Sequence, residues 1–196
     1  ILFMHAAGYI TDHGFDSTEM QRLTGISLRR CDFERAKLTL DIPGAVIKEL
    51  DFSHRINAWR EKQPGKERVK FNMPPIFEID EPCEALGVFV ENGGIGFGVK
   101  ERENGGFDAY CACAPVPAEL LNILARRAGC FEYCSPGNVV YANSSLITIY
   151  SYKGGDVLIH TPENADMYEY FSGESISDGA MVNFEPIETK IFIKTD

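Results

Sequence analysis

The residues most able to carry out chemistry are the six cysteines of this 196-residue chain. Cys111-x-Cys113 and Cys130-x₃-Cys134 could offer four thiolates to one zinc ion, but structural zinc sites usually hold cysteines in tighter C-x₂-C pairs. A chain of this length can also build its own hydrophobic core without disulfides. The favoured interpretation is therefore six reduced, mostly buried thiols in a cytoplasmic protein, with no metal and no cofactor.

Nucleophilic catalysis finds little support in the sequence. Cys111 or Cys113 could act as a thiolate nucleophile, but the sequence identifies no general base beside either one. The chain contains no G-x-C-x-G or G-x-S-x-G elbow, the turn that presents the nucleophile in many hydrolases. We therefore predict no catalytic residue from motifs.

Asp12 and His13 are the loop-site candidates. They are neighbours in the loop that follows the first expected strand. Binding sites of α/β proteins usually lie in such loops, at the carboxyl ends of strands. The other three histidines, His5, His54 and His160, are scattered along the chain and indicate no site.

Tyr168, Tyr170 and Phe171 form an aromatic cluster near the end of the chain. In a strand, alternation would place Tyr168 and Tyr170 on one face and Glu169 on the other, where a solvated carboxylate is expected. Two interpretations of the aromatic side chains stay open. They could form a platform that binds carbohydrate, or they could be ordinary surface residues of a strand.

The charge balance argues against two classes of partner. Nineteen basic residues against 29 acidic ones give a net charge of −10 and a pI near 4.9. Such a surface repels phosphate backbones and anionic lipids, and no run of eighteen apolar residues is present, so we expect neither nucleic-acid nor membrane partners. The basic residues cluster in residues 51–70, as Arg55, Arg60, Lys62, Lys66, Arg68 and Lys70 around a Pro64-Gly65 turn. A solvated loop is expected there, because Glu61 and Glu67 are interspersed, with an anion site as the alternative.

Residues 1–130 should alternate strands with helices. A buried strand is expected over residues 1–10, and its apolar start suggests a chain cut from something larger. A helix should follow, begun by Asp16 and Glu19 as a capping box and ended by Gly25. Residues 36–42 predict a strand, and residues 85–113 predict a three-stranded meander joined by two Glu-Asn-Gly-Gly turns. Pro117 should open a helix that ends at Gly129.

The last third of the chain should be all β. Six short strands are expected beyond residue 135, over 138–143, 145–151, 156–161, 167–171, 180–184 and 188–194, separated by turn residues. This pattern favours a small antiparallel β-sandwich. The sequence therefore predicts two domains, an α/β domain over residues 1–134 and a β-sandwich over residues 135–196.

Several short motifs resemble those of β-galactosidase-like glycoside hydrolases, in the region that follows their catalytic barrel. The matching positions are Leu23 to Ile26, Ala128-Gly129, Phe131 to Tyr133, Val139 to Asn143, and Phe171-Ser172-Gly173. The resemblance implies a partial glutamine-amidotransferase-like (flavodoxin-like) α/β domain, incomplete at its N-terminus, followed by a small terminal β domain. In that family the amidotransferase-like domain lacks the chemistry of true amidotransferases and serves trimer assembly.

The function that the resemblance implies is a non-catalytic assembly or accessory role in a multidomain glycoside hydrolase. The catalytic carboxylates of such enzymes lie in a (β/α)₈ barrel, which needs about 250 residues and does not fit in this chain. The expected partners are further copies of the chain, as a trimer, or the missing catalytic barrel. Two alternatives stay open: a carbohydrate-binding module and a small stand-alone α/β hydrolase.

Overall fold

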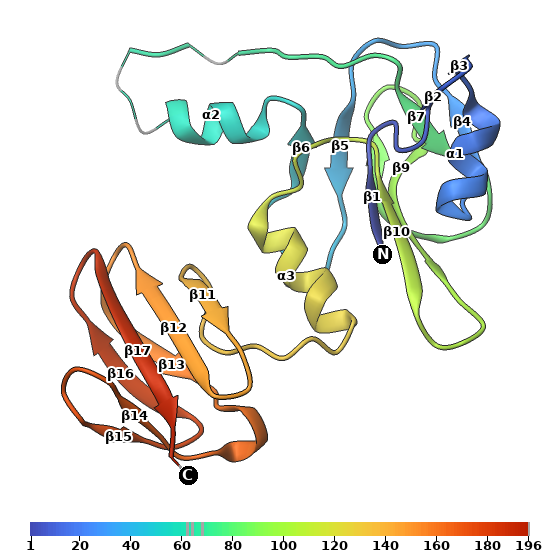
Figure 1. Cartoon of the computed structure of the whole chain (residues 1–196). Coiled ribbons are helices and arrows are strands. Elements are labelled where there is room, and N and C mark those ends of the chain that lie inside the picture. Colours follow the sequence, from blue (N-terminus) through green and yellow to red (C-terminus); the bar gives the residue numbers. More distant parts are fainter. Residues whose placement is uncertain (62, 64, 68, 196) are drawn as a thin grey trace. The chain divides into compact units, whose positions relative to one another are not determined.

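The computed structural model describes residues 1–61, 63, 65–67 and 69–195, so Lys62, Pro64 and Arg68 of the basic stretch lie outside the described residues. The chain divides into two compact units, Ile1–Ala128 and Gly129–Asp196 (Figure 1). The division falls a few residues before the boundary that the sequence predicts. The amide of Ser135 donates to the Leu158 carbonyl at 2.9 Å, which ties the stretch around residue 135 to the second unit.

The first unit is built on an eight-stranded mixed sheet. Its strands run in the order β1-β10-β9-β8-β5-β6, while β7 pairs with both β4 and β9. Their bounds are β1 Leu2–Met4, β4 Leu28–Arg30, β5 Lys37–Leu40, β6 Glu49–Asp51, β7 Phe77–Ile79, β8 Glu84–Phe89, β9 Ile95–Glu101 and β10 Phe107–Cys111. Adjacent antiparallel pairing of β8, β9 and β10 confirms the expected meander.

The sheet differs from a flavodoxin-like sheet in strand direction. Among the described strands of this sheet, only β1 and β10 pair in parallel, with Leu2 opposite Ala109. A flavodoxin-like sheet is parallel, because helical crossovers return each strand in the same direction. Here tight turns join consecutive strands instead, and Gly93 and Gly105 supply the positive φ angles of 73° and 82° that these turns use. The amidotransferase-like assignment stays a prediction.

The expected long opening strand is wrong. Only Leu2–Met4 pairs with the sheet, and the chain then bends at His5 and Gly8, which both have positive φ. A separate two-stranded hairpin follows, β2 (Ile10–Thr11) with β3 (Gly14–Phe15). The backbone cannot continue as a strand through residues in the left-handed region.

Of the three α-helices in the described part of the first unit, two were predicted and one was not. Helix α1 (Ser17–Thr24) begins at Asp16 and ends at Gly25, and α3 (Ala118–Arg127) follows Pro117. The capping box is incomplete, because Asp16 accepts from the Thr18 amide but Glu19 pairs with Arg22. Helix α2 (His54–Arg60) lies where a solvated loop was expected, so that expectation is wrong.

The core of the first unit lies between the sheet and the segments packed on it. Phe97, Tyr110, Cys111 and Cys113 are fully buried, together with Met20 of α1 and Leu120 of α3. Alternation along β5 buries Leu38 and Leu40 and exposes Thr39, as the sequence pattern predicts. Among the described residues, no helix is long and apolar enough to span a bilayer.

The second unit consists of two antiparallel sheets, ordered β11-β12-β17-β14-β15 and β13-β16. Their bounds are β11 Val139–Ala142, β12 Leu146–Ser151, β13 Gly155–Ile159, β14 Met167–Glu169, β15 Ser175–Ile176, β16 Ala180–Phe184 and β17 Glu188–Lys194, with a short 3₁₀ turn at Pro162–Asn164. Both sheets contribute to one core, since Ile149 and Phe192 pack in the same cluster as Val157 and Phe184. All six expected strands are present, and β15 is additional.

Candidate functional site

Asp12 and His13 lie at the tip of the β2–β3 hairpin. The turn is held by Thr11, whose hydroxyl donates to the Gly14 carbonyl at 3.0 Å and accepts from the His13 amide at 3.1 Å. A hollow of about 420 Å³ is lined by the hairpin and by Glu19. Both candidate side chains are exposed. The lining contains no cysteine, serine or tyrosine, and its one hydroxyl, that of Thr11, is engaged in the hydrogen bonds of the turn. The hairpin is thus an open acidic surface and offers little for covalent catalysis.

The three aromatic candidates of the second unit divide into a pair and a separate residue. Tyr170 and Phe171 are exposed and touch edge to face, with ring centroids 5.2 Å apart and an interplanar angle of 78°. Tyr168 lies within β14 and is half-buried. Because the two exposed rings are nearly perpendicular, one sugar ring could stack flat on only one of them.

The turn that carries Tyr170 and Phe171 is organised by Glu169. This carboxylate is buried, so the expectation that it is solvated is wrong. One oxygen accepts from the Phe171 amide at 3.1 Å and from the Ser172 amide at 2.7 Å, and the other accepts from the Ile191 amide at 3.5 Å. Burial acts to raise the pKa of Glu169, but these amide donors outweigh it and hold the pKa below its ordinary value.

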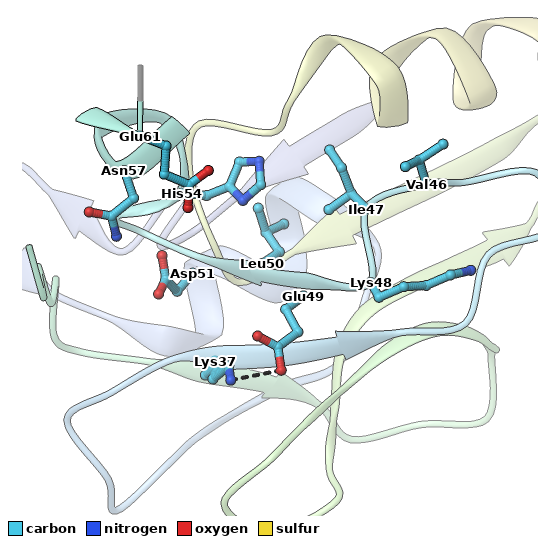
Figure 2. A pocket seen from close by; sticks show the side chains of 10 residues that line it. All are labelled: Lys37, Val46, Ile47, Lys48, Glu49, Leu50, Asp51, His54, Asn57 and Glu61. Carbon is cyan, nitrogen blue, oxygen red and sulfur yellow. Dashed lines mark ion pairs between the residues drawn. The ribbon is translucent and has the colours of Figure 1, made fainter. Parts of the chain in front are cut away.

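A polar pocket of about 310 Å³ lies between β6 and α2 (Figure 2). It is lined by Lys37 of β5, by residues 46–51, and by His54, Asn57 and Glu61 in and after α2. An imidazole among carboxylates could exchange protons with a ligand. The lining holds no serine, threonine, cysteine or tyrosine that could act as a nucleophile.

Most polar groups of this pocket already serve the fold. Lys37 and Glu49 form an ion pair across β5 and β6 at 2.8 Å. Asp51 accepts from the Ser53 amide at 2.8 Å, and Asn57 exchanges two hydrogen bonds with the backbone of Val69. The pocket is therefore a place where polar side chains join α2 to the sheet, and it does not assemble a catalytic group.

Sequence reasoning missed this region because residues 51–70 are rich in charge. The signal was present in the apolar residues, since Phe52, Ile56 and Trp59 follow one another at i, i+4 and i+7. That spacing places three side chains on one face of a helix. The structure forms α2 over His54–Arg60, which includes Ile56 and Trp59 and begins two residues after Phe52.

The cysteines are not arranged for catalysis or for metal binding. Burial raises the pKa of Cys111 to about 12 and that of Cys113 further still, so neither is a thiolate at neutral pH. The described residues contain no group of three or more side chains able to hold a metal ion. All six cysteines are free, and Cys130 alone is exposed.

The whole chain has the fold of one part of known β-galactosidases. No family model and no curated protein matches the sequence. Among solved structures, a β-galactosidase from Bacillus circulans sp. alkalophilus matches 99% of this chain with a TM-score of 0.61 and 12% identity. A catalytic mutant of Gan42B, a GH42 β-galactosidase from G. stearothermophilus, matches 98% with a TM-score of 0.55 and 11% identity. A β-galactosidase from the psychrophilic Marinomonas ef1 matches 99% with a TM-score of 0.51 and 13% identity.

The matches cover only part of those enzymes. This chain spans 29%, 27% and 25% of the three chains, respectively. Identities of this size establish similarity of fold and nothing finer. The sequence resemblance to β-galactosidase-like glycoside hydrolases is therefore supported at the level of the fold. The type of domain and its role stay predictions.

Proposed function

We propose that this chain is a non-catalytic assembly and accessory region of a multidomain glycoside hydrolase of the β-galactosidase kind. The observation that carries the proposal is the match of 98–100% of the chain to little more than a quarter of GH42 β-galactosidase chains. A (β/α)₈ barrel with the paired carboxylates of a glycosidase needs about 250 residues, more than this chain contains. The chemistry of the whole enzyme would then lie in the barrel.

The described side chains support the non-catalytic part of this proposal. The cysteines that could act as nucleophiles are buried thiols with raised pKa values. The Asp12–His13 hairpin and the pocket at His54 are lined by groups that hold turns and elements together. A reduced state of all six cysteines also fits the cytoplasmic setting that we propose for the protein.

Two measurements on the purified chain test the proposal. An aryl β-galactoside should not be hydrolysed above the level of a mock preparation from cells that lack the gene. Light scattering at micromolar concentration should give a mass well above 21.9 kDa, and three times that value for the trimer suggested by the family resemblance. Turnover that co-purifies with the chain would contradict the non-catalytic role, and a monomer at every concentration would contradict self-assembly.

A carbohydrate-binding role for the second unit is the second candidate. It is favoured by Tyr170 and Phe171, which expose aromatic rings on a turn fixed by Glu169. Stacking of sugar rings on aromatic faces is an established mode of recognition. Binding of galacto-oligosaccharides should be measured by calorimetry for the chain and for Tyr170→Ala, with the exposed Tyr141→Ala as control. The role requires binding that Tyr170→Ala abolishes and Tyr141→Ala preserves.

A further inference from the structure

An apolar groove of about 820 Å³ runs along α2 in the first unit. Its lining consists of Phe52, Arg55, Ile56, Trp59, Arg60, Phe71, Met73, Ala114 and Pro115. Trp59 leaves 60% of its surface exposed, and Ile56, Phe71 and Met73 are exposed as well. A contiguous apolar surface of this kind marks an interaction site more often than a free surface. The two charged residues in the lining are both arginines.

The groove is formed in advance, because its two walls are tied together by hydrogen bonds. The Asn57 side chain accepts from the Val69 amide at 2.8 Å and donates to the Val69 carbonyl at 3.0 Å. The Ser53 hydroxyl accepts from the Phe71 amide, and Arg60 donates to the Glu67 carbonyl at 3.1 Å. The segment that carries Phe71 is thus fixed against α2, and a partner would not have to order it.

The β2–β3 hairpin is complementary to this groove, because its apolar side chains project from the surface and its charged neighbours are acidic. Ile10 and Phe15 project from it with 78% and 74% of their surfaces exposed. Phe15 stacks on Tyr9 at 5.3 Å, and Tyr9 in turn contacts the buried Phe77 at 5.1 Å, so the projection is anchored in the core. Acidic side chains flank it, with Asp12 at the turn and Asp16 directly after β3.

We propose that the hairpin of one copy of this chain docks into the α2 groove of the next copy. The apolar parts match, since Ile10 and Phe15 would cover Trp59 and its neighbours. The charges also match, with Asp12 on the hairpin and Arg55 in the groove. The proposal rests on the assembly role proposed above and names the surfaces that carry it out.

The two surfaces lie at opposite ends of the first unit, as Figure 1 shows for α2 and the β2–β3 hairpin. They cannot meet within one molecule, so the contact must join different copies. It is also heterologous, because each copy contributes a different surface. Heterologous contacts close into rings when the rotation between copies permits, and a trimer is one such ring.

The groove fits other partners less well. Binding of a sugar or phosphate needs several polar groups in the site. The lining offers only the guanidinium groups of two arginines among apolar side chains. A basic partner would be repelled by the same arginines. The acidic side chains that flank Ile10 and Phe15 on the hairpin of a second copy, Asp12 and Asp16, are suited to them.

The experiment combines light scattering with the fluorescence of Trp59, the only tryptophan of the chain. Assembly should bury the indole, so dilution of the wild-type chain should move its emission to longer wavelength as the mass falls. Ile10→Asp and Trp59→Ala should each weaken association about 30-fold or more, as loss of a central apolar contact does. Val90→Asp changes an exposed apolar residue outside both surfaces and should assemble like the wild type.

Mixing the two variants gives the decisive result. Ile10→Asp keeps an intact groove and Trp59→Ala keeps an intact hairpin, so together they can form one contact. Each should be a monomer alone, and the mixture should give a species of twice 21.9 kDa. A mixture that stays monomeric would overturn the proposal, because a heterologous contact must be complemented in this way.

A charge exchange provides a second test that leaves the apolar residues in place. Asp12→Arg and Arg55→Glu should each weaken association, and the chain that carries both changes should recover most of it. Wild-type assembly that neither the apolar nor the charge variants disturb would overturn this contact and leave the assembly role standing. A wild-type chain that is monomeric at every concentration would overturn both the contact and self-assembly.

Discussion

Gly154, in the turn between β12 and β13, is required both by its backbone angle and by the space around it. Its φ is +70°, and a Cβ there would lie 2.7 Å from the Pro186 nitrogen and 2.8 Å from the Phe184 carbonyl oxygen. Gly173 has nearly the same φ, +72°, but nothing lies within 4 Å of the Cβ position. The pair therefore separates the effect of backbone angle from that of crowding.

We expect Gly173→Ala to lower the free energy of unfolding by about 1–2 kcal/mol, the cost of a left-handed residue that has a Cβ. Gly154→Ala should lower it by about 1–3 kcal/mol more, because backbone atoms cannot move aside as flexible side chains can. Urea unfolding followed by circular dichroism measures both. Equal effects of the two substitutions would show that the backbone around Gly154 moves aside with no cost in free energy, and would contradict the role of crowding.

Glu169 should make the second unit sensitive to acid. Because its pKa is lowered in the folded state, its contribution to stability is present above the unfolded pKa of about 4.3 and is lost as pH falls through the folded pKa. Glu169→Gln should lower the free energy of unfolding by about 1–3 kcal/mol at pH 7. The difference from the wild type should shrink steadily below about pH 4.

Glu174→Gln is the matched control for this prediction. Glu174 is exposed on the same turn, so its substitution should change the free energy of unfolding by less than about 0.5 kcal/mol. Unfolding in urea at several pH values between 3 and 7 measures both variants. A constant difference between Glu169→Gln and the wild type over that range would contradict the assigned role.

At the scale of the element, α1 begins with one functional cap where the sequence suggests two. Asp16 accepts from the Thr18 amide at 2.8 Å, but its own amide donates to the Tyr9 carbonyl, so Glu19 has no amide to close the box. Asp16→Ala should lower the free energy of unfolding by about 1 kcal/mol. Glu19→Ala should cost less than about 0.5 kcal/mol, since it removes only the surface pair with Arg22. Thermal unfolding of the two variants should rank them in that order.

In helix α3 an acidic residue also has a role that the local sequence does not indicate. Glu119 in its first turn suits the positive end of the helix dipole, which the sequence alone predicts. In the structure the carboxylate also accepts from the amides of Val46 and Ile47, in the loop before β6. Glu119 therefore has two roles: it stabilises the first turn of α3, and its hydrogen bonds to Val46 and Ile47 join α3 to the loop before β6.

At the scale of the whole molecule, the number of cysteine thiols that react with a reagent, before and after unfolding, tests the fold. Without reductant, the denatured chain should react with six equivalents of a thiol reagent. The native chain should react fast only at Cys130, because the other five are buried or half-buried and burial raises their pKa values. Cys130→Ser should remove the fast phase and lower the total to five. A total of four or fewer for the wild type would indicate a disulfide.

Local sequence patterns are enough to predict most strands of the second unit and the meander of the first. Alternating residues with turn glycines, such as Ile147 and Ile149 before Gly154, predict strands because the pattern is local and its period is two. The same holds for α1 and α3, whose ends are marked by Asp16, Gly25 and Pro117. These features depend on neighbours in the chain and need no knowledge of what lies across the core.

The pairing of strands, and the places where polar and apolar side chains come together, depend on contacts between distant parts of the chain. Tight turns joined neighbouring strands in antiparallel pairs, so the sheet did not become the parallel one that the strand-then-helix order suggested. Glu169 looks like a solvated strand residue until three amides from two segments are brought to it. Phe71 and Trp59 lie twelve positions apart, and they line one groove because Asn57 binds Val69. Such contacts join residues that are distant in sequence, so local patterns of residues do not predict them.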